Sequence, residues 1–298
     1  MRKSLPPDTY ENLYHPPVGY KYFENAAQHP FNPRAARFSP VNAWWLADTA
    51  VLAYEKDSAT VNNWLRAAGL PDMLPFGNWE PIGWEPRAFV TSTDSFAIVS
   101  FRGTQRNNFP DLLADLKAKP VPEDGFEVHH GFKTYLDKIW EGMNSYLQGI
   151  QQKNPRTVFY FTGHSLGAAL ATLAVLRFSG DAALYNLGSP RVGDSAFQHR
   201  LLTRPNTRGL FRFVNCGDEV TRLPPELGVY THAGTEEYID RNGAIHDNYS
   251  DAAQEADGKA GQKLHRGGLH TPPFFIGNHS PGRYPVLIWN FYLAEHLG

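Results

Sequence analysis

Apolar residues follow two different patterns along the middle of the chain. Continuous runs of β-branched and aromatic residues are typical of buried strands, and the clearest of them cover 87–92, 95–101 and 158–162. Two shorter apolar runs, each ending in a polar loop, cover 183–187 and 210–215. The stretches that favour helices cover 42–55, 132–152 and 285–296. Because strands and helices alternate, we expect an α/β fold with a mainly parallel central sheet and helices on both faces.

One junction between a predicted strand and a predicted helix has unusual residue types. The sequence Gly163-His164-Ser165-Leu166-Gly167 follows an aromatic run and precedes an alanine-rich one. Glycine on both sides removes side chains where a strand and a helix crowd each other, so the chain is expected to turn sharply at the serine. A G-x-S-x-G pattern in this setting is typical of the nucleophile elbow of α/β hydrolases. The alternative is a turn serine or a helix cap.

A serine hydroxyl needs a histidine to take its proton and a carboxylate to orient that histidine. In α/β hydrolases the acid follows the serine in the chain, and the histidine follows the acid. Asp218 comes shortly after the apolar run 210–215, so we expect it at the carboxyl edge of the sheet. The other acids considered are Glu219, Asp240 and Asp194, of which Asp194 is better explained as the cap of the next helix. A loop aspartate that binds backbone amides is the alternative role for Asp218.

The candidate base is one of the histidines that follow Asp218 in the chain. They are His232, His246, His265, His270, His279 and His296. His279 lies in the turn before the final predicted helix, where the fold places its last catalytic loop. By position alone, His270 is its nearest rival.

The tetrahedral intermediate of ester hydrolysis carries an oxyanion that needs hydrogen-bond donors. The backbone N–H of Leu166, directly after the serine, is the first expected donor. The second is expected from the loop after an earlier strand, where Thr104 offers a backbone N–H and a hydroxyl. An ordinary polar turn is the alternative for Thr104.

Two segments differ in composition from the alternating middle of the chain. Residues 1–38 are rich in proline and are expected to form an extended arm that either wraps the domain or lies free, while 39–298 are expected to form one catalytic domain. Residues 240–273 are rich in Gly, Asp, Asn and His and contain few large apolar residues. This composition predicts a long polar loop, either a flap over the site or a mobile insertion.

Whole-chain composition narrows the classes of function. The 298 residues are 42% hydrophobic with a formal net charge of −2 and no blocks of Lys and Arg, so we expect no nucleic-acid partner. The single cysteine, Cys216, excludes an intrachain disulfide, and no residue spacing suggests a metal or an organic cofactor. No apolar signal core follows the first basic residues, and no run is long enough to span a membrane. We expect a soluble protein, or one that lies on an interface, with its compartment and oligomeric state left open.

Several separated motifs together resemble one family, the class 3 lipases, which are the fungal-type triacylglycerol lipases among the α/β hydrolases. The matching stretches are FRGT (101–104), HHGF (129–132), GHSLGAAL (163–170), NLGSPRVGD (186–194), NCGDEVTRLPP (215–225) and NHSPGRY (278–284). The resemblance implies that Ser165 is the nucleophile, Asp218 the orienting acid and His279 the base. It also implies an oxyanion hole formed by Thr104 and the Leu166 amide.

The resemblance further implies a short amphipathic lid over the site, in residues 107–119. The apolar lid candidates are Phe109, Leu112, Leu113 and Leu116, and a helix fixed against the core is the alternative. The implied substrate is an acylglycerol or another lipid ester, with transient contact to a lipid interface. Phospholipase A1 or feruloyl-type esterase activity is the alternative within the family, and a non-catalytic lipid-binding protein is the alternative from another class. Many secreted fungal relatives have a signal peptide and disulfides, so their location does not carry over.

Overall fold

The computed structural model describes most of the chain. The described ranges are 1–12, 19–79, 85–104, 119–226, 229–265 and 271–297. The four lid candidates, Phe109, Leu112, Leu113 and Leu116, and the rival base His270 therefore lie outside the described residues.

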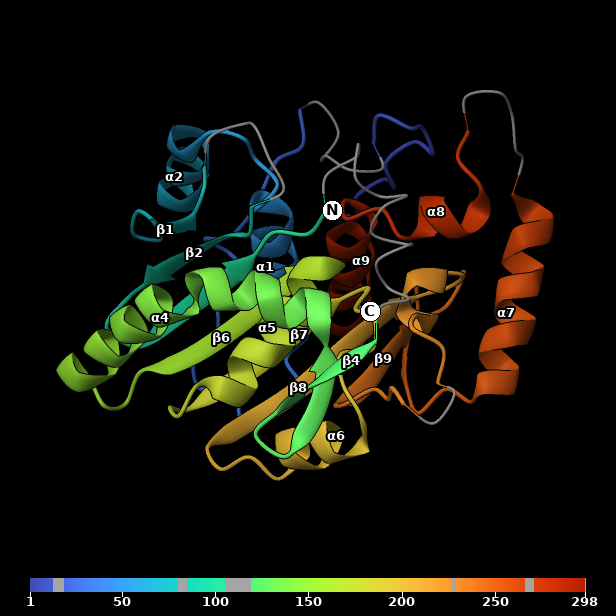
Figure 1. Ribbon diagram of the computed structural model, residues 1–298. Helices are drawn as coiled ribbons and strands as arrows, with labels where there is room; N and C mark the ends of the chain where they lie inside the picture. The colour runs from blue at the N-terminus through green and yellow to red at the C-terminus, as the bar shows by residue number, and fades with distance from the viewer. Residues whose placement is uncertain (13–18, 80–84, 105–118, 227–228, 266–270, 298) are drawn as a thin grey trace.

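A single large sheet forms the centre of the described molecule (Figure 1). Its eight strands lie in the order β1-β2-β3-β6-β7-β8-β9-β10. Their bounds are Leu74–Gly77 (β1), Arg87–Ser92 (β2), Phe96–Phe101 (β3), Val158–His164 (β6), Ala182–Leu187 (β7), Thr207–Asn215 (β8), Thr235–Ile239 (β9) and Ile245–Asp247 (β10). The five strands from β3 to β9 are parallel, whereas β1, β2 and β10 pair antiparallel at the two edges. The predicted α/β fold with a mainly parallel sheet is therefore confirmed.

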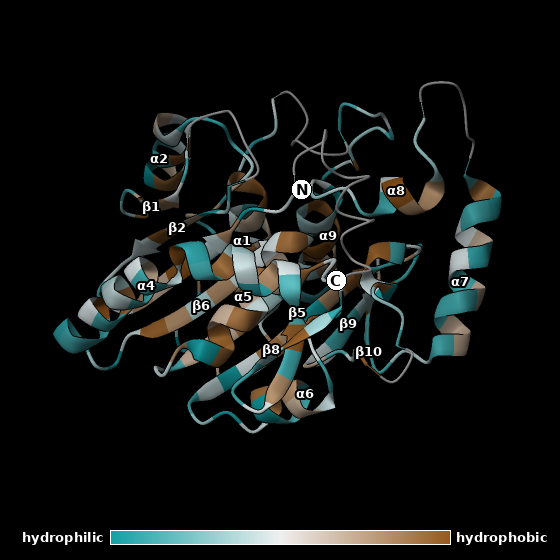
Figure 2. Ribbon diagram, in the orientation of Figure 1, coloured by the Kyte–Doolittle hydropathy of each residue, from teal (hydrophilic) through white to brown (hydrophobic). Residues whose placement is uncertain are grey.

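Helices cover both faces of this sheet. One face carries α1 (Pro40–Leu52) and α9 (Arg283–Leu297), and the other carries α4 (His130–Lys153) and α5 (Leu166–Arg177). Each layer buries its own apolar cluster, and in Figure 2 the central strand β6 is largely hydrophobic whereas α4 carries many hydrophilic positions. The other described helices are α2 (Ser58–Ala67), α6 (Ser195–Leu202), α7 (Asp251–Leu264), α8 (Phe274–Asn278) and the 3₁₀ turn η2 (Glu219–Arg222). A separate hairpin pairs β4 (Pro120–Glu123) with β5 (Phe126–His129).

Polar residues begin several of these helices where the sequence offers a cap. The carboxylate of Asp194 accepts a hydrogen bond from the backbone N–H of Phe197 at the start of α6, as predicted. The side chains of Ser39, Asp57 and Ser250 accept equivalent bonds at the starts of α1, α2 and α7. These caps satisfy backbone donors that have no acceptor within their own helix.

The prediction of a long polar loop at 240–273 is wrong for much of that segment. Strand β10 pairs with β9 there, and α7 follows as a helix of 14 residues beside that edge of the sheet (Figure 1). The residues that α7 buries are Gln254, Asp257 and Gly261, so no apolar period marks the helix in the sequence. The buried Asp257 carboxylate accepts hydrogen bonds from the Tyr238 hydroxyl and from Arg241. Polar contacts thus attach α7 to the edge of the sheet, although the composition of this segment predicts a loop.

The described part of the N-terminal arm packs against the domain. Tyr22 and Phe23 are buried, and the Asp48 carboxylate on α1 accepts bonds from the Tyr20 hydroxyl at 2.5 Å and the Phe23 backbone N–H at 2.8 Å. Burial raises the pKa of Asp48. The arm is therefore attached to the sheet's covering helix by both apolar burial and a buried carboxylate.

The buried Glu237 generates a prediction about stability and pH. It lies on β9 opposite Asp247 on β10, and its pKa is raised to about 7 by burial and by that neighbouring carboxylate. The buried side chain is stable in its protonated form. Its contribution to the stability of the fold is therefore complete below about pH 4.5, the pKa of an ordinary glutamate, and is lost as the pH rises through about 7.

We therefore expect the free energy of unfolding at pH 8 to be about 1–2 kcal/mol higher for Glu237→Gln than for the native protein. The difference is expected to vanish near pH 4.5, where the native side chain is protonated. Urea unfolding at both pH values measures it, with the exposed Glu295→Gln as the control. An equal gain at both pH values would contradict the electrostatic explanation.

Candidate active site

Ser165 occupies a strained turn between β6 and α5. Its φ is +59°, a left-handed value that side chains other than glycine rarely adopt. A Cβ on Gly163 would lie 2.4 Å from the backbone carbon of Gly167, and one on Gly167 would lie 2.2 Å from the Phe101 carbonyl oxygen. The Ser165 backbone N–H donates to the Leu187 carbonyl at 3.0 Å, which fixes the turn. The two glycines are therefore required for the close packing of helix on sheet, as the sequence predicted.

The structure brings Ser165, His279 and Asp218 into one hydrogen-bonded line. The His279 Nε2 lies 2.9 Å from the Ser165 Oγ, and its Nδ1 lies 2.9 Å from both carboxylate oxygens of Asp218. Ser165 follows β6, Asp218 follows β8 and His279 follows α8, and all three are buried. With Nδ1–H donating to Asp218, the Nε2 of His279 can accept the serine proton.

The other described candidate histidines are engaged elsewhere. His232 and His265 lie within hydrogen-bond distance of the carbonyls of Thr221 and Pro272. His246 contacts Asp240, and His296 contacts the carbonyl of Tyr292 within α9. Among the described histidines named from the sequence, His279 alone contacts Ser165 in this arrangement.

Tyr284 supports the acid and was not singled out from the sequence. Its hydroxyl donates to Asp218 Oδ2 at 2.6 Å and accepts from the Asn215 backbone N–H at 3.2 Å. The Val220 backbone N–H donates to the other carboxylate oxygen at 3.1 Å. Burial and the nearby Asp218 charge raise the pKa of Tyr284, so it remains a donor at neutral pH. The motif NHSPGRY contains Tyr284, but nothing in its spacing indicates contact with a residue 66 positions earlier.

Gly188 is a second residue whose importance becomes visible only in the structure. It has a φ of +56°, and a Cβ there would lie 2.9 Å from Asp218 Oδ2 and 3.2 Å from His279 Cε1. A side chain at this position would push into the acid and the histidine together. The motif NLGSPRVGD was the available signal, and its glycine lies directly after β7.

Thr104 offers an unused donor near the serine turn. Its Oγ1 is buried and has no hydrogen-bond partner among the residues that the structure describes. The preceding Gly103 packs tightly, because a Cβ on it would lie 2.0 Å from the Tyr54 hydroxyl and 2.5 Å from the His164 carbonyl. The loop that carries Thr104 therefore rests directly on the serine turn. Leu166 begins α5, so its backbone N–H has no acceptor within the helix.

His164 supports this turn as a neutral side chain. Its Nδ1 lies 2.8 Å from the Tyr54 hydroxyl, and its ring centroid lies 4.6 Å from that of His279. Burial, followed by the neighbouring His279, lowers the pKa of His164 well below that of a free histidine. A neutral ring here adds no charge that would oppose protonation of His279.

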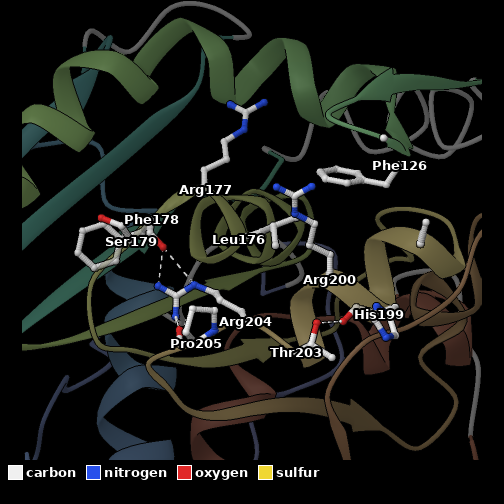
Figure 3. A pocket seen from close by; sticks show the side chains of 12 residues that line it. Phe126, Leu176, Arg177, Phe178, Ser179, His199, Arg200, Thr203, Arg204 and Pro205 are labelled. Atoms are coloured by element: carbon white, nitrogen blue, oxygen red, sulfur yellow. Dashed lines mark hydrogen bonds between the residues drawn. The ribbon is translucent and has the colours of Figure 1, made fainter.

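A pocket of about 680 Å³ lies at the opposite end of α5 from Ser165 (Figure 3). Its lining includes Arg177, which binds the carboxylates of Glu123 and Asp137. It also includes Arg204, which donates to the carbonyls of Phe178 and Gly180. These two guanidinium groups hold neighbouring elements together, and the pocket is separate from the serine turn.

The described residues contain no group of three or more His, Cys, Asp or Glu placed to hold a metal ion. Nor does any helix in the described ranges have the length and apolar character needed to cross a membrane.

Comparison with known proteins finds a family similar to the middle of the chain. Residues 98–228 match the family model "Lipase (class 3)". The chain is 33% identical over 153 residues to the "Secreted mono- and diacylglycerol lipase 1" of Fusarium solani, an alignment that covers 48% of this chain and 44% of that protein. It is 32% identical over 187 residues to the lipase of Rhizomucor miehei, covering 57% and 50% respectively. The chain thus spans about half the length of these curated relatives.

The fold is shared with solved structures as well. The native propeptide complex of the Rhizomucor miehei lipase matches with a TM-score of 0.62 and 20% identity, and the alignment covers 94% of this chain and 98% of that one. At 20% identity, this similarity shows that the two proteins share a fold. The family match covers the segment that contains Ser165 and Asp218, and the likeness to solved structures shows that the chain has the α/β-hydrolase fold.

Proposed function

We propose that this protein is a serine carboxylic ester hydrolase, and specifically a lipase that cleaves acylglycerols through an acyl-enzyme. The observation that carries the proposal is the continuous line of hydrogen bonds from Ser165 through His279 to Asp218. The relatives named as lipases support a lipid ester as the substrate. A protein that only binds lipid has no use for this buried and mutually oriented set.

The reaction follows from the positions of the atoms. Ser165 Oγ attacks the ester carbonyl carbon while His279 Nε2 takes the hydroxyl proton, and Asp218 stabilises the resulting imidazolium. The carbonyl electron pair moves onto the oxygen, giving a tetrahedral intermediate. When it collapses, the bond to the alcohol oxygen breaks and His279 gives its proton to the leaving alcohol. Water then attacks the acyl-enzyme by the same steps and releases the carboxylic acid.

The oxyanion of that intermediate needs donors that are already in place. We assign this role to the backbone N–H of Leu166 and to the N–H and hydroxyl of Thr104. A buried hydroxyl without a partner costs about 1–3 kcal/mol, so the unpaired Thr104 Oγ1 is stabilised when an oxyanion arrives. Because the oxygen is fully charged only in the intermediate, this bond favours the reaction over substrate binding.

Replacing the nucleophile tests the proposal directly. Ser165→Ala should lower the kcat for p-nitrophenyl butyrate by at least about 10⁴-fold while the fold persists. A fluorophosphonate probe should label the native protein and leave the variant unlabelled, and the exposed Ser179→Ala is the control. Long-chain esters and a triacylglycerol emulsion extend the assay to lipids. Unchanged ester hydrolysis in Ser165→Ala would refute the assignment.

The hydroxyl of Thr104 can be tested apart from its backbone. Thr104→Val keeps the shape and the N–H, so we expect kcat to fall by up to about 10²- to 10³-fold with little change in KM. Thr104→Ser, which restores the hydroxyl, should recover most of the rate. Equal rates for the valine variant and the native enzyme would leave only the backbone N–H as a donor.

Tyr284 should affect both stability and rate. Tyr284→Phe removes one of the two donors to Asp218 Oδ2, so the free energy of unfolding should fall by about 1–2 kcal/mol. A less firmly held carboxylate also orients His279 less well, so we expect a lower kcat at unchanged KM. Urea unfolding and ester hydrolysis measure the two effects, with the half-buried Tyr146→Phe on α4 as the control. A variant with native kcat would show that Tyr284 serves stability alone.

A further inference from the structure

The first residues of the chain contact the loop that carries His279. That loop runs from His279 to Gly282, between α8 and α9. The Ser280 hydroxyl donates to the Asn12 carbonyl at 2.7 Å, directly after the histidine. Arg283, at the start of α9, donates to the Asp8 carboxylate at 2.6 Å. Two contacts from a segment more than 260 residues away in the sequence therefore hold the chain that follows His279.

The same segment is fixed at its other end to α9. The Lys3 backbone N–H donates to the Asn290 side-chain oxygen at 2.7 Å, and the Asn290 amide donates back to the Lys3 carbonyl at 2.8 Å. The Trp289 indole N–H donates to the Met1 carbonyl at 3.0 Å. The Lys3 ammonium also lies 5.5–6.0 Å from the ring centroids of Tyr20, Trp44 and Trp289. Residues 1–12 are therefore attached to the helix that follows the histidine loop as well as to the loop itself.

The contacts on the other side of His279 come from the domain. The Asn215 side-chain amide donates to the Asn278 carbonyl at 2.9 Å, so the residue before His279 is tied to the end of β8. The residues after it are tied to Asp8 and Asn12. A general base must be held within about 0.5 Å of its working position, because a small misplacement lowers the rate steeply. Contacts on both sides of His279 in the chain therefore help to fix its position.

We propose that residues 1–12 are a positioning strap for His279, acting through the Asp8–Arg283 ion pair and the Asn12 carbonyl. This inference rests on the proposed function, in which His279 is the base. Asp8 and Asn12 are positioning residues that act through the loop. The ion pair is partly shielded, with side-chain exposures of 35% for Asp8 and 16% for Arg283, so water weakens it less than a fully exposed pair.

Steady-state kinetics of Asp8→Asn on p-nitrophenyl butyrate test the strap. We expect kcat and the rate of fluorophosphonate labelling to fall by about 3- to 10-fold, with KM within twofold of native. Asp8→Glu keeps the charge and should recover at least half of the lost rate. Asp72→Asn is the matched control, because it removes another 2.6 Å ion pair, with Arg66, that has no contact with the site.

A second variant makes the test independent of the ion pair. Ser280→Ala removes the bond to the Asn12 carbonyl and should lower kcat by about 2- to 5-fold in the same assay. Native kcat and labelling rates in both variants would overturn the proposal. Faster turnover or labelling would also overturn it, since the segment would then obstruct the site. If the native protein itself neither cleaves esters nor reacts with the probe, the proposed function fails instead.

Discussion

The close approach of α5 to the central sheet is the constraint on which the site depends. Backbone atoms of the helix and of the neighbouring loop lie where a Cβ on Gly163 or Gly167 would have to fit. The chain between these glycines can connect strand and helix only through a left-handed residue, and Ser165 is that residue. The strain projects its hydroxyl from the carboxyl edge of the sheet, toward the loops that carry Asp218 and His279. Packing between two apolar elements thus produces the turn that orients the nucleophile.

Around that turn, the buried polar groups satisfy one another. Asp218 accepts from His279, Tyr284 and the Val220 amide, so its charge is compensated by three hydrogen-bond donors. Gly188 leaves room for both the acid and the histidine. Among the described site residues, the Thr104 hydroxyl and the Nε2 of His164 are buried without a partner. In our proposal the Thr104 hydroxyl is reserved for the oxyanion, and the contacts among Ser165, His279 and Asp218 are complete beforehand.

The parts of this arrangement that were predictable from sequence are those encoded locally. The glycine-flanked serine lies between a strand-like and a helix-like run, and Asp218 follows an apolar run that became β8. The contacts of Tyr284 and Asp8 were not predictable, because each joins positions far apart in the chain without any repeating pattern. Helix α7 was missed for a different reason: its buried face is made of Gln254, Asp257 and Gly261, which carry no hydrophobic period. The roles of the oxyanion donors and of His279 stay predictions until the variants are measured.

The hydrogen bonds between Lys3 and Asn290 determine when, during synthesis of the chain, the site can assemble. These residues are 287 positions apart, and α9 also supplies Tyr284 and begins at Arg283, just after the loop that carries His279. On the ribosome, Ser165 and Asp218 emerge while the N-terminal segment still lacks the helix on which it rests. We therefore expect the nascent chain to remain inactive until α9 has docked, because only then are both His279 and the partner of Asp218 in place.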